Sequence, residues 1–107
     1  MDDIPLIEDP ANEQTVLRAF VRDGRLLRIP ARERKKRVVL RWLLDRSIPD
    51  DGPVEERDVN MRIALLNADV SSLRRYLVDA GLVTRAGMVY RSVPPLRRDP
   101  APGPPLV

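Results

Sequence analysis

The stretch LRRYLVDAGLVTRAGMVYR, residues 73–91, decides the fold. Its first half places apolar residues at helical spacing and ends at Gly81, a residue typical of helix C-termini. Two short apolar runs, 82–85 and 88–91, then flank Ala86-Gly87, which predicts a β-hairpin. A helix followed directly by such a hairpin is typical of the recognition helix and wing of a winged-helix domain.

The residues before this stretch predict further helices. Asn12 can cap a helix over 13–22 that Asp23-Gly24 would stop, and 25–29 is a short strand candidate. Further helices are expected over 31–46, over 54–66 and, after an Asn67-Ala68 turn, from a cap at Asp69 or Ser71 up to Ala80. The fold class is therefore mainly α with a small β-hairpin, winged helix-turn-helix-like.

The ends of the chain differ in composition from its middle. Residues 1–11 are acidic and contain two prolines, and 94–107 read PPLRRDPAPGPPLV. We expect an irregular acidic arm over 1–11, one winged-helix-like domain over 12–93 and a Pro-rich disordered tail over 94–107.

The composition argues against several classes of protein. The chain has neither cysteine nor histidine, so the usual metal ligands and the commonest general base are missing. Neighbouring carboxylates at a helix start, such as Glu55 and Glu56, do not face one another as a catalytic pair would. We expect no enzyme, metal, cofactor or small-molecule ligand. No apolar segment or signal peptide is evident, so we expect a cytoplasmic protein without membrane contact.

The net charge of +3 conceals a segregation of charge along the chain. Residues 1–24 and 47–69 each carry a net charge of −4, whereas 25–46 carry +7 and 70–107 carry +4. A basic block that reaches a phosphate backbone gains affinity through counterion release, whatever the net charge of the chain. The alternative is a solvated surface with ordinary ion pairs between the blocks.

The predicted recognition helix and wing supply one set of nucleic-acid-binding residues. Arg75 is the best candidate for a base contact, because a guanidinium can bind guanine in a bidentate manner. The other residues expected to contact phosphate or base are Ser71, Ser72, Arg74, Arg85 and Arg91. Alternatively, Arg74 and Arg75 pair with nearby acids such as Asp79.

The run ARERKKR, residues 31–37, and the helix that follows supply a second set. Arg34, Lys35, Lys36, Arg37 and Arg41 form a possible clamp on the phosphate backbone. Cations at a helix N-terminus oppose the helix dipole, which favours a functional reason for the run over a merely charged first turn.

Val38 and Trp42 lie four residues apart on a different face of this helix from its main apolar stripe of leucines. They form either a partner or dimer surface or, as is more usual for such residues, part of the core.

Two segments carry a family resemblance: FVRDGRLLRIPARERKKRVVLRWLL and VEERDVNMRIALLNADVSSLRRYLVDAGLVTRAGMVYR. They are similar to the bacterial domain-of-unknown-function 2087 family, whose members show a "DGRL" step, an "E-x-x-VN" helix, an "LRR-x-LVD-x-GL" block and a terminal "YRR"-like strand. The family often has a histidine at Asn67 and an aromatic residue at Val54. The resemblance implies nucleic-acid binding by a stand-alone domain.

From the helix–hairpin pattern, the two basic blocks and this resemblance, we expect a nucleic-acid-binding transcriptional regulator, with DNA favoured over RNA. The alternative is a protein-interaction winged helix that docks on a transcription complex or associates with itself. The Pro-rich tail and the acidic segments favour this second interpretation.

Overall fold

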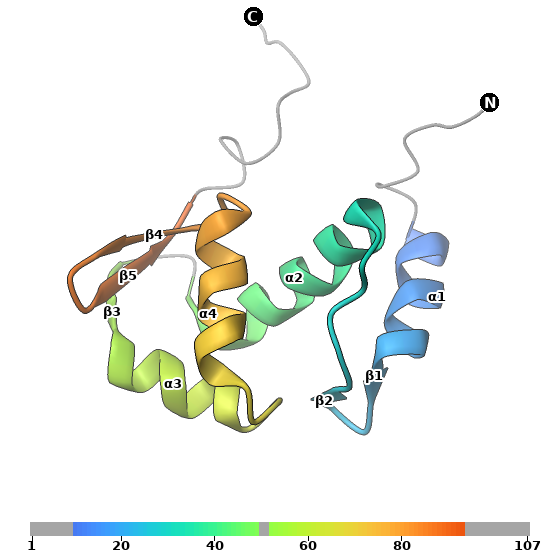
Figure 1. The fold of residues 1–107 in the computed structure, drawn as a ribbon, viewed down its shortest axis with the longest axis horizontal. Helices are drawn as coiled ribbons and strands as arrows, with labels where there is room; N and C mark the ends of the chain where they lie inside the picture. The colour runs from blue at the N-terminus through green and yellow to red at the C-terminus, as the bar shows by residue number, and fades with distance from the viewer. Residues whose placement is uncertain (1–9, 50–51, 94–107) are drawn as a thin grey trace, which may run out of the picture.

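The computed structural model describes residues 10–49 and 52–93, and the side chains from Asn12 onward. These residues form four helices and two small antiparallel sheets (Figure 1). The helices are α1 (Pro10–Phe20), α2 (Glu33–Ser47), α3 (Glu56–Ala64) and α4 (Val70–Asp79); the strands are β1 (Val21–Arg22), β2 (Arg25–Leu26), β3 (Val54–Glu55), β4 (Val83–Ala86) and β5 (Val89–Ser92).

The first sheet is a hairpin of which the sequence predicted only the second strand, over 25–29, and in the structure that strand is Arg25–Leu26. α1 ends at Phe20, and β1 pairs with β2 across Asp23-Gly24. Both turn residues have positive φ angles, 54° and 77°, as a two-residue turn between twisted strands requires. Asp23-Gly24 therefore turns a hairpin and does not stop a helix. At its other end α1 starts at Pro10, so Asn12 is not its cap and the predicted arm loses its last two residues. The rest of that arm and the predicted tail lie outside the described residues.

α2 is the central helix, because it packs against α1 on one side and against α3 and α4 on the other (Figure 1). This arrangement accounts for the two apolar faces in its sequence. Val38 and Trp42 are only 7% and 8% exposed, and Val38 lies beside Val16 of α1. Both residues belong to the core, so the structure favours core packing over the partner surface that the sequence also allowed.

The second sheet has the strand order β3-β5-β4. Its strand β3 occupies the start of the segment that we expected to be helical over 54–66, because Val54 pairs with Tyr90 of β5. The β4–β5 turn lies at Gly87-Met88, one residue later than predicted, since Ala86 still pairs with Val89. Gly87 has a φ of 63° and takes the first turn position, where glycine meets no steric penalty.

The turn between α3 and α4 is held against the first hairpin. The backbone N–H of Leu26 donates to the carbonyl of Leu66 (2.9 Å), and the Asn67 side-chain amide donates to the carbonyl of Leu26 (2.8 Å). The Asn67 oxygen accepts from the N–H of Asp69 (2.7 Å). Asp69 is the N-cap residue of α4, as one of the two sequence alternatives had it, but its side chain makes no cap hydrogen bond, and Ser71 lies within the helix. The start of α4 is thus fixed relative to the rest of the domain.

No helix in the described part of the chain is long and apolar enough to cross a membrane.

Candidate functional site

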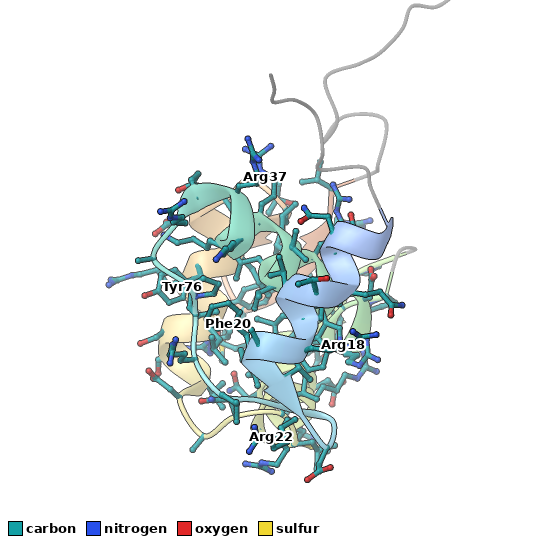
Figure 2. All side chains as sticks on the ribbon, turned by 90° about the vertical axis from the view of Figure 1, so that its right-hand side faces the viewer. Arg18, Phe20, Arg22, Arg37 and Tyr76 are labelled. Atoms are coloured by element: carbon teal, nitrogen blue, oxygen red, sulfur yellow. The ribbon has the colours of Figure 1, made fainter. Side chains whose placement is uncertain are left out.

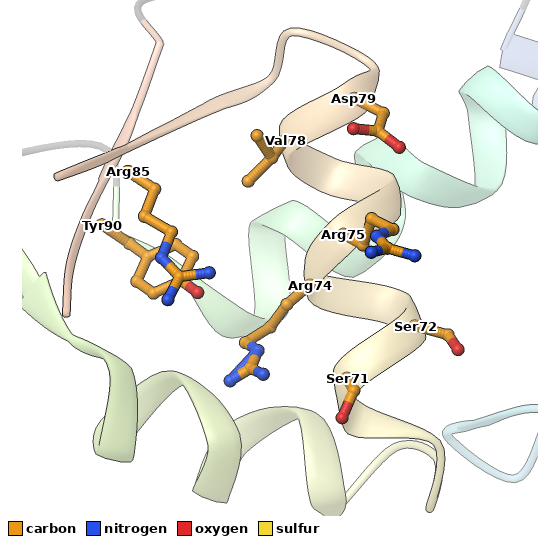
Figure 3. A pocket seen from close by; sticks show the side chains of 8 residues that line it. All are labelled: Ser71, Ser72, Arg74, Arg75, Val78, Asp79, Arg85 and Tyr90. Carbon is orange, nitrogen blue, oxygen red and sulfur yellow. The ribbon is translucent and has the colours of Figure 1, made fainter. Parts of the chain in front are cut away.

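A hollow of about 430 Å³ lies between α4 and the β4–β5 hairpin. Its lining residues are Ser71, Ser72, Arg74, Arg75, Val78, Asp79, Arg85 and Tyr90 (Figure 3). Arg74 and Arg85 extend into the space between the helix and the hairpin, whereas Arg75 and Asp79 point to the other side of α4. The structure therefore brings together five of the residues that the sequence assigned to nucleic-acid binding.

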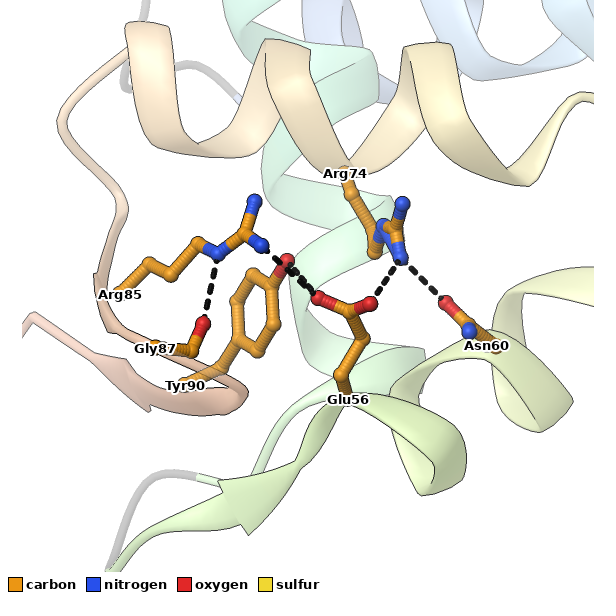
Figure 4. Close-up of polar contacts among 6 residues, drawn as sticks. All are labelled: Glu56, Asn60, Arg74, Arg85, Gly87 and Tyr90. Atoms are coloured by element: carbon orange, nitrogen blue, oxygen red, sulfur yellow. Dashed lines mark hydrogen bonds and ion pairs between the residues drawn. The ribbon is translucent and has the colours of Figure 1, made fainter.

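Glu56, the first residue of α3, organises the wall of this hollow (Figure 4). Its Oε1 accepts a hydrogen bond from the Tyr90 hydroxyl (2.8 Å) and lies 3.3 Å from Arg85 Nη2. Its Oε2 lies 3.2 Å from Arg74 Nη1. Because β3 pairs with β5, the helix that follows β3 begins directly beside Tyr90. One carboxylate thus ties α3 to both α4 and the hairpin.

The two arginines differ in how much of each side chain is open to solvent. Arg74 is 18% exposed, and its Nη1 also donates to Asn60 Oδ1 (2.7 Å). Arg85 is 49% exposed, and its Nε donates to the carbonyl of Gly87 (2.8 Å). Its guanidinium also lies 5.5 Å from the Tyr90 ring centroid. The guanidinium of Arg74 is therefore mostly enclosed by protein groups, whereas the guanidinium of Arg85 contacts the protein on one edge and solvent on the other.

The electrostatics of the network favour a charged Glu56 and a neutral Tyr90. The pKa of Glu56 is lowered from its ordinary 4.5, first by the Tyr90 hydrogen bond and then by the positive charges of Arg74 and Arg85, against an opposing effect of burial. The pKa of Tyr90 is raised from its ordinary 10.0, first by burial and then because its hydroxyl donates to Glu56. One carboxylate with two guanidiniums leaves the cluster one positive charge in excess.

Arg75 is exposed and forms no ion pair with any described residue. The sequence alternative of pairing with Asp79 does not apply to it, and the acid that binds Arg74 is Glu56. Arg75 is therefore the arginine of α4 that is free to contact a ligand.

The basic run at the start of α2 is divided between two sides of the molecule. Lys36 Nζ lies 5.5 Å from the ring centroid of Tyr76, which places it beside α4. Arg34 and Lys35 line a separate hollow next to α1, and Arg41 pairs with Glu13 of α1 (3.8 Å). Arg37 extends into solvent at the end of the molecule where α2 begins (Figure 2). The structure therefore does not gather this run into one surface with α4.

Arg91 lies on the far side of the second sheet from this hollow. Arg85 pairs with Tyr90, so these two side chains share one face of the sheet. Arg91 follows Tyr90 in β5, and successive residues of a strand point to opposite faces. Arg91 is thus separated from the other residues that the sequence predicted for the wing.

A family model matches residues 25–92, more than half of the chain, and is described as an uncharacterized protein conserved in bacteria, DUF2087. The chain belongs to this family. The resemblance seen in the sequence is thereby confirmed, and the match covers β2 through β5 but not α1. No curated protein and no solved structure matches the chain.

Sequence reasoning missed three residues of the network: Glu56, Asn60 and Tyr90. The sequence marks Glu56 only as one of two neighbouring carboxylates at a helix start, and Tyr90 only as part of the second apolar run of the hairpin. The signal was present in the DUF2087 resemblance, because the "E-x-x-VN" pattern supplies Glu56 and Asn60. The "LRR" block supplies Arg74. These separate patterns meet at one carboxylate in the structure.

The described residues contain no group of three acidic side chains that could hold a metal ion. What the hollow presents is a set of guanidinium and hydroxyl donors, which suits an anion.

Proposed function

We propose that this DUF2087 protein is a winged-helix domain that binds nucleic acid, DNA in preference to RNA, as a transcription regulator in the bacterial cytoplasm. The element order α2-β3-α3-α4-β4-β5 and the strand order β3-β5-β4 support this fold. In this scheme α3 and α4 are the helix-turn-helix pair and the β4–β5 hairpin is the wing. The first hairpin, which braces the α3–α4 turn, and α1, which packs on α2, are additions to this fold.

The observation that carries the proposal is the composition of the exposed side of α4. Arg75 lies there without an ion-pair partner among the described residues, on a helix whose opposite side buries Leu73 and Leu77. Lys36 flanks one edge of α4, and Arg85 of the hairpin flanks the other. The helix α2, the helix α4 and the strand β4 thus each place one cation on or beside α4.

This arrangement suits the division of labour in DNA recognition. A recognition helix enters the major groove and presents side chains to base edges, while residues around it contact phosphates. Arg75 takes the base-reading role, because its guanidinium can bind guanine in a bidentate manner. Ser71 and Ser72, in the first turn of α4, can donate to phosphate together with the free N–H groups of the helix start.

The interface is narrower than the sequence predicted. It comprises Lys36, Arg75 and Arg85, together with the two serines, and leaves out Arg34, Lys35, Arg37, Arg41 and Arg91. Arg74 is not a direct contact of this interface, because its guanidinium already binds Glu56 and Asn60.

A mobility-shift series with duplex DNA, single strands and structured RNA at two salt concentrations tests the proposal. We expect binding to duplex DNA that weakens with salt. Arg75→Ala should weaken it by about 1–3 kcal/mol, the usual contribution of a bidentate base contact. Arg18→Ala, which removes an exposed arginine of α1 at the opposite end of the molecule, is the matched control (Figure 2). Equal binding by both variants would exclude α4 as the reading helix.

A second candidate function, a protein-interaction module, is favoured by a different observation. Met61 and Leu65, one turn apart at the end of α3, are 63% and 73% exposed. Adjacent apolar side chains of this kind are common at protein-interaction sites. Replacing both with glutamine should leave DNA binding unchanged; a loss of self-association in sedimentation would support this second function.

A further inference from the structure

The hollow between α4 and the hairpin holds an unbalanced set of charges. Glu56 contributes one negative charge to the network, and Arg74 and Arg85 contribute one positive charge each. Among the other residues that line the hollow, the positive charge of Arg75 is matched by the negative charge of Asp79. The site as a whole therefore carries one uncompensated positive charge.

Hydrogen-bond donors also remain at this site. The hydrogen bond to Gly87 and the ion pair with Glu56 use Nε and Nη2 of Arg85, so further N–H groups of its half-exposed guanidinium are open. Arg74 Nε is buried and has no hydrogen-bond partner among the described residues. The Ser71 hydroxyl lies at the same side of α4 as the Arg74 guanidinium (Figure 3). Open donors and an excess positive charge are what an anion site requires.

We propose that this hollow binds one phosphate group in its singly charged diester form, with Arg85 and Ser71 as the direct ligands. We further propose that Glu56 is a positioning residue that holds the two guanidiniums and competes with the phosphate for Arg85. The inference rests on the proposed function for the source of the phosphate, a nucleic-acid backbone, but the charge and donor pattern do not depend on it.

The charge of the ligand follows from the charge of the site. A phosphodiester carries one negative charge, which matches the single excess positive charge. Its two non-bridging oxygens fit the planar fork of a guanidinium. A doubly charged phosphate monoester would leave an excess negative charge close to Glu56, and the hollow should bind it less well.

The role of Glu56 can be separated from simple structural support. Glu56→Gln keeps an oxygen that accepts from Tyr90 but removes the negative charge that competes with the ligand. We expect this variant to be less stable than the wild type and yet to bind phosphodiester about fivefold more tightly, as deletion of one like charge at close range predicts. A residue with a merely structural role would lose stability and affinity together.

The first experiment measures the affinity of the full chain for duplex DNA between about 50 and 200 mM salt by fluorescence anisotropy. Each phosphate contact contributes about 0.9 to the slope of log K against log salt. We expect Arg85→Gln to lower the magnitude of the slope by about 0.9 and the control Arg18→Gln to leave it unchanged. Arg85→Lys, which keeps the charge, should retain the slope. An unchanged slope in Arg85→Gln overturns the site.

The second experiment removes the nucleic acid. Dimethyl phosphate and inorganic phosphate are titrated separately while the arginine side-chain resonances are followed by NMR. We expect dimethyl phosphate to shift Arg85 and to bind more tightly than inorganic phosphate. Shifts with dimethyl phosphate but no binding of DNA would uphold the site and overturn the proposed function. If DNA binds, but the slope is unaltered in Arg85→Gln and the Arg85 resonances do not shift, the proposed function stands and the phosphate site is overturned.

Discussion

The two basic regions of this molecule differ in what their positive charges face. The run at the start of α2 is the denser of the two in sequence, yet Arg41 pairs with Glu13, and Arg34 and Lys35 line a hollow beside α1. The arginines of α4 and the hairpin are spread more widely in sequence, but Arg74 and Arg85 meet at the single carboxylate of Glu56. One acid can therefore bring cations from separate elements to one place, which the density of cations along the sequence does not reveal.

The largest effect on stability should come from Tyr90, whose hydroxyl donates to Glu56. Tyr90→Phe removes a hydrogen bond to a charged acceptor, which usually contributes about 1.5–3 kcal/mol to stability. Tyr76 of α4, whose ring lies 5.5 Å from Lys36 Nζ of the α2 run, is 36% exposed, and Tyr76→Phe should change the free energy of unfolding by much less. Urea unfolding of both variants measures the difference, and equal losses would contradict a special role for the carboxylate.

Binding of duplex DNA should separate the two regions next. Replacing Arg34 and Lys35 together with alanine removes two cations, whereas Arg75→Ala removes one. We expect the double variant to lose less binding free energy than the roughly 1–3 kcal/mol predicted for Arg75→Ala, because Arg34 and Lys35 line a hollow beside α1. Anisotropy at one fixed salt concentration measures both. A greater loss in the double variant would place the phosphate backbone over α2.

The sequence predicted much of this fold because its signals were local. Each predicted helix exists with shifted ends, and the C-terminal hairpin is displaced by a single residue. The strand β3 could not be predicted, since its two residues are extended only because Val54 pairs with Tyr90, distant in sequence. The dipeptide Asp-Gly is common both at helix ends and in hairpin turns, so the local sequence at Asp23-Gly24 could not decide between the two.

The candidate site was predictable only in part for the same reason. The cations of α4 are visible in the sequence, but the acid that engages Arg74 comes from another helix and not from Asp79 on the same one. Arg85 and Arg91 differ in this respect, because the alternation of side chains in the predicted hairpin already places them on opposite faces, as the observed register does. Long-range contacts were needed only to bring Glu56 to Arg74 and Arg85.

The pH dependence of stability should also distinguish the Glu56 network from the rest of the protein. The lowered pKa of Glu56 means that its stabilisation is complete above its ordinary value of 4.5 and is lost as the pH falls through the lowered pKa. The raised pKa of Tyr90 means that its contribution is present below its ordinary 10.0 and is lost as the pH rises through the raised value. Glu56→Gln should therefore show a flatter loss of stability in acid than the wild type in urea unfolding.

The smallest effect should come from the ion pair that holds the basic run of α2. Glu13 and Arg41 are 31% and 35% exposed and 3.8 Å apart, a geometry in which solvent screens most of the attraction. Glu13→Gln should therefore change the free energy of unfolding by less than about 1 kcal/mol. The same substitution removes the negative charge beside Arg41, a cation of the α2 run. If that run contacts DNA, the variant should bind duplex DNA more tightly; we expect its affinity to stay at the wild-type value, because the surface that we propose for DNA is α4.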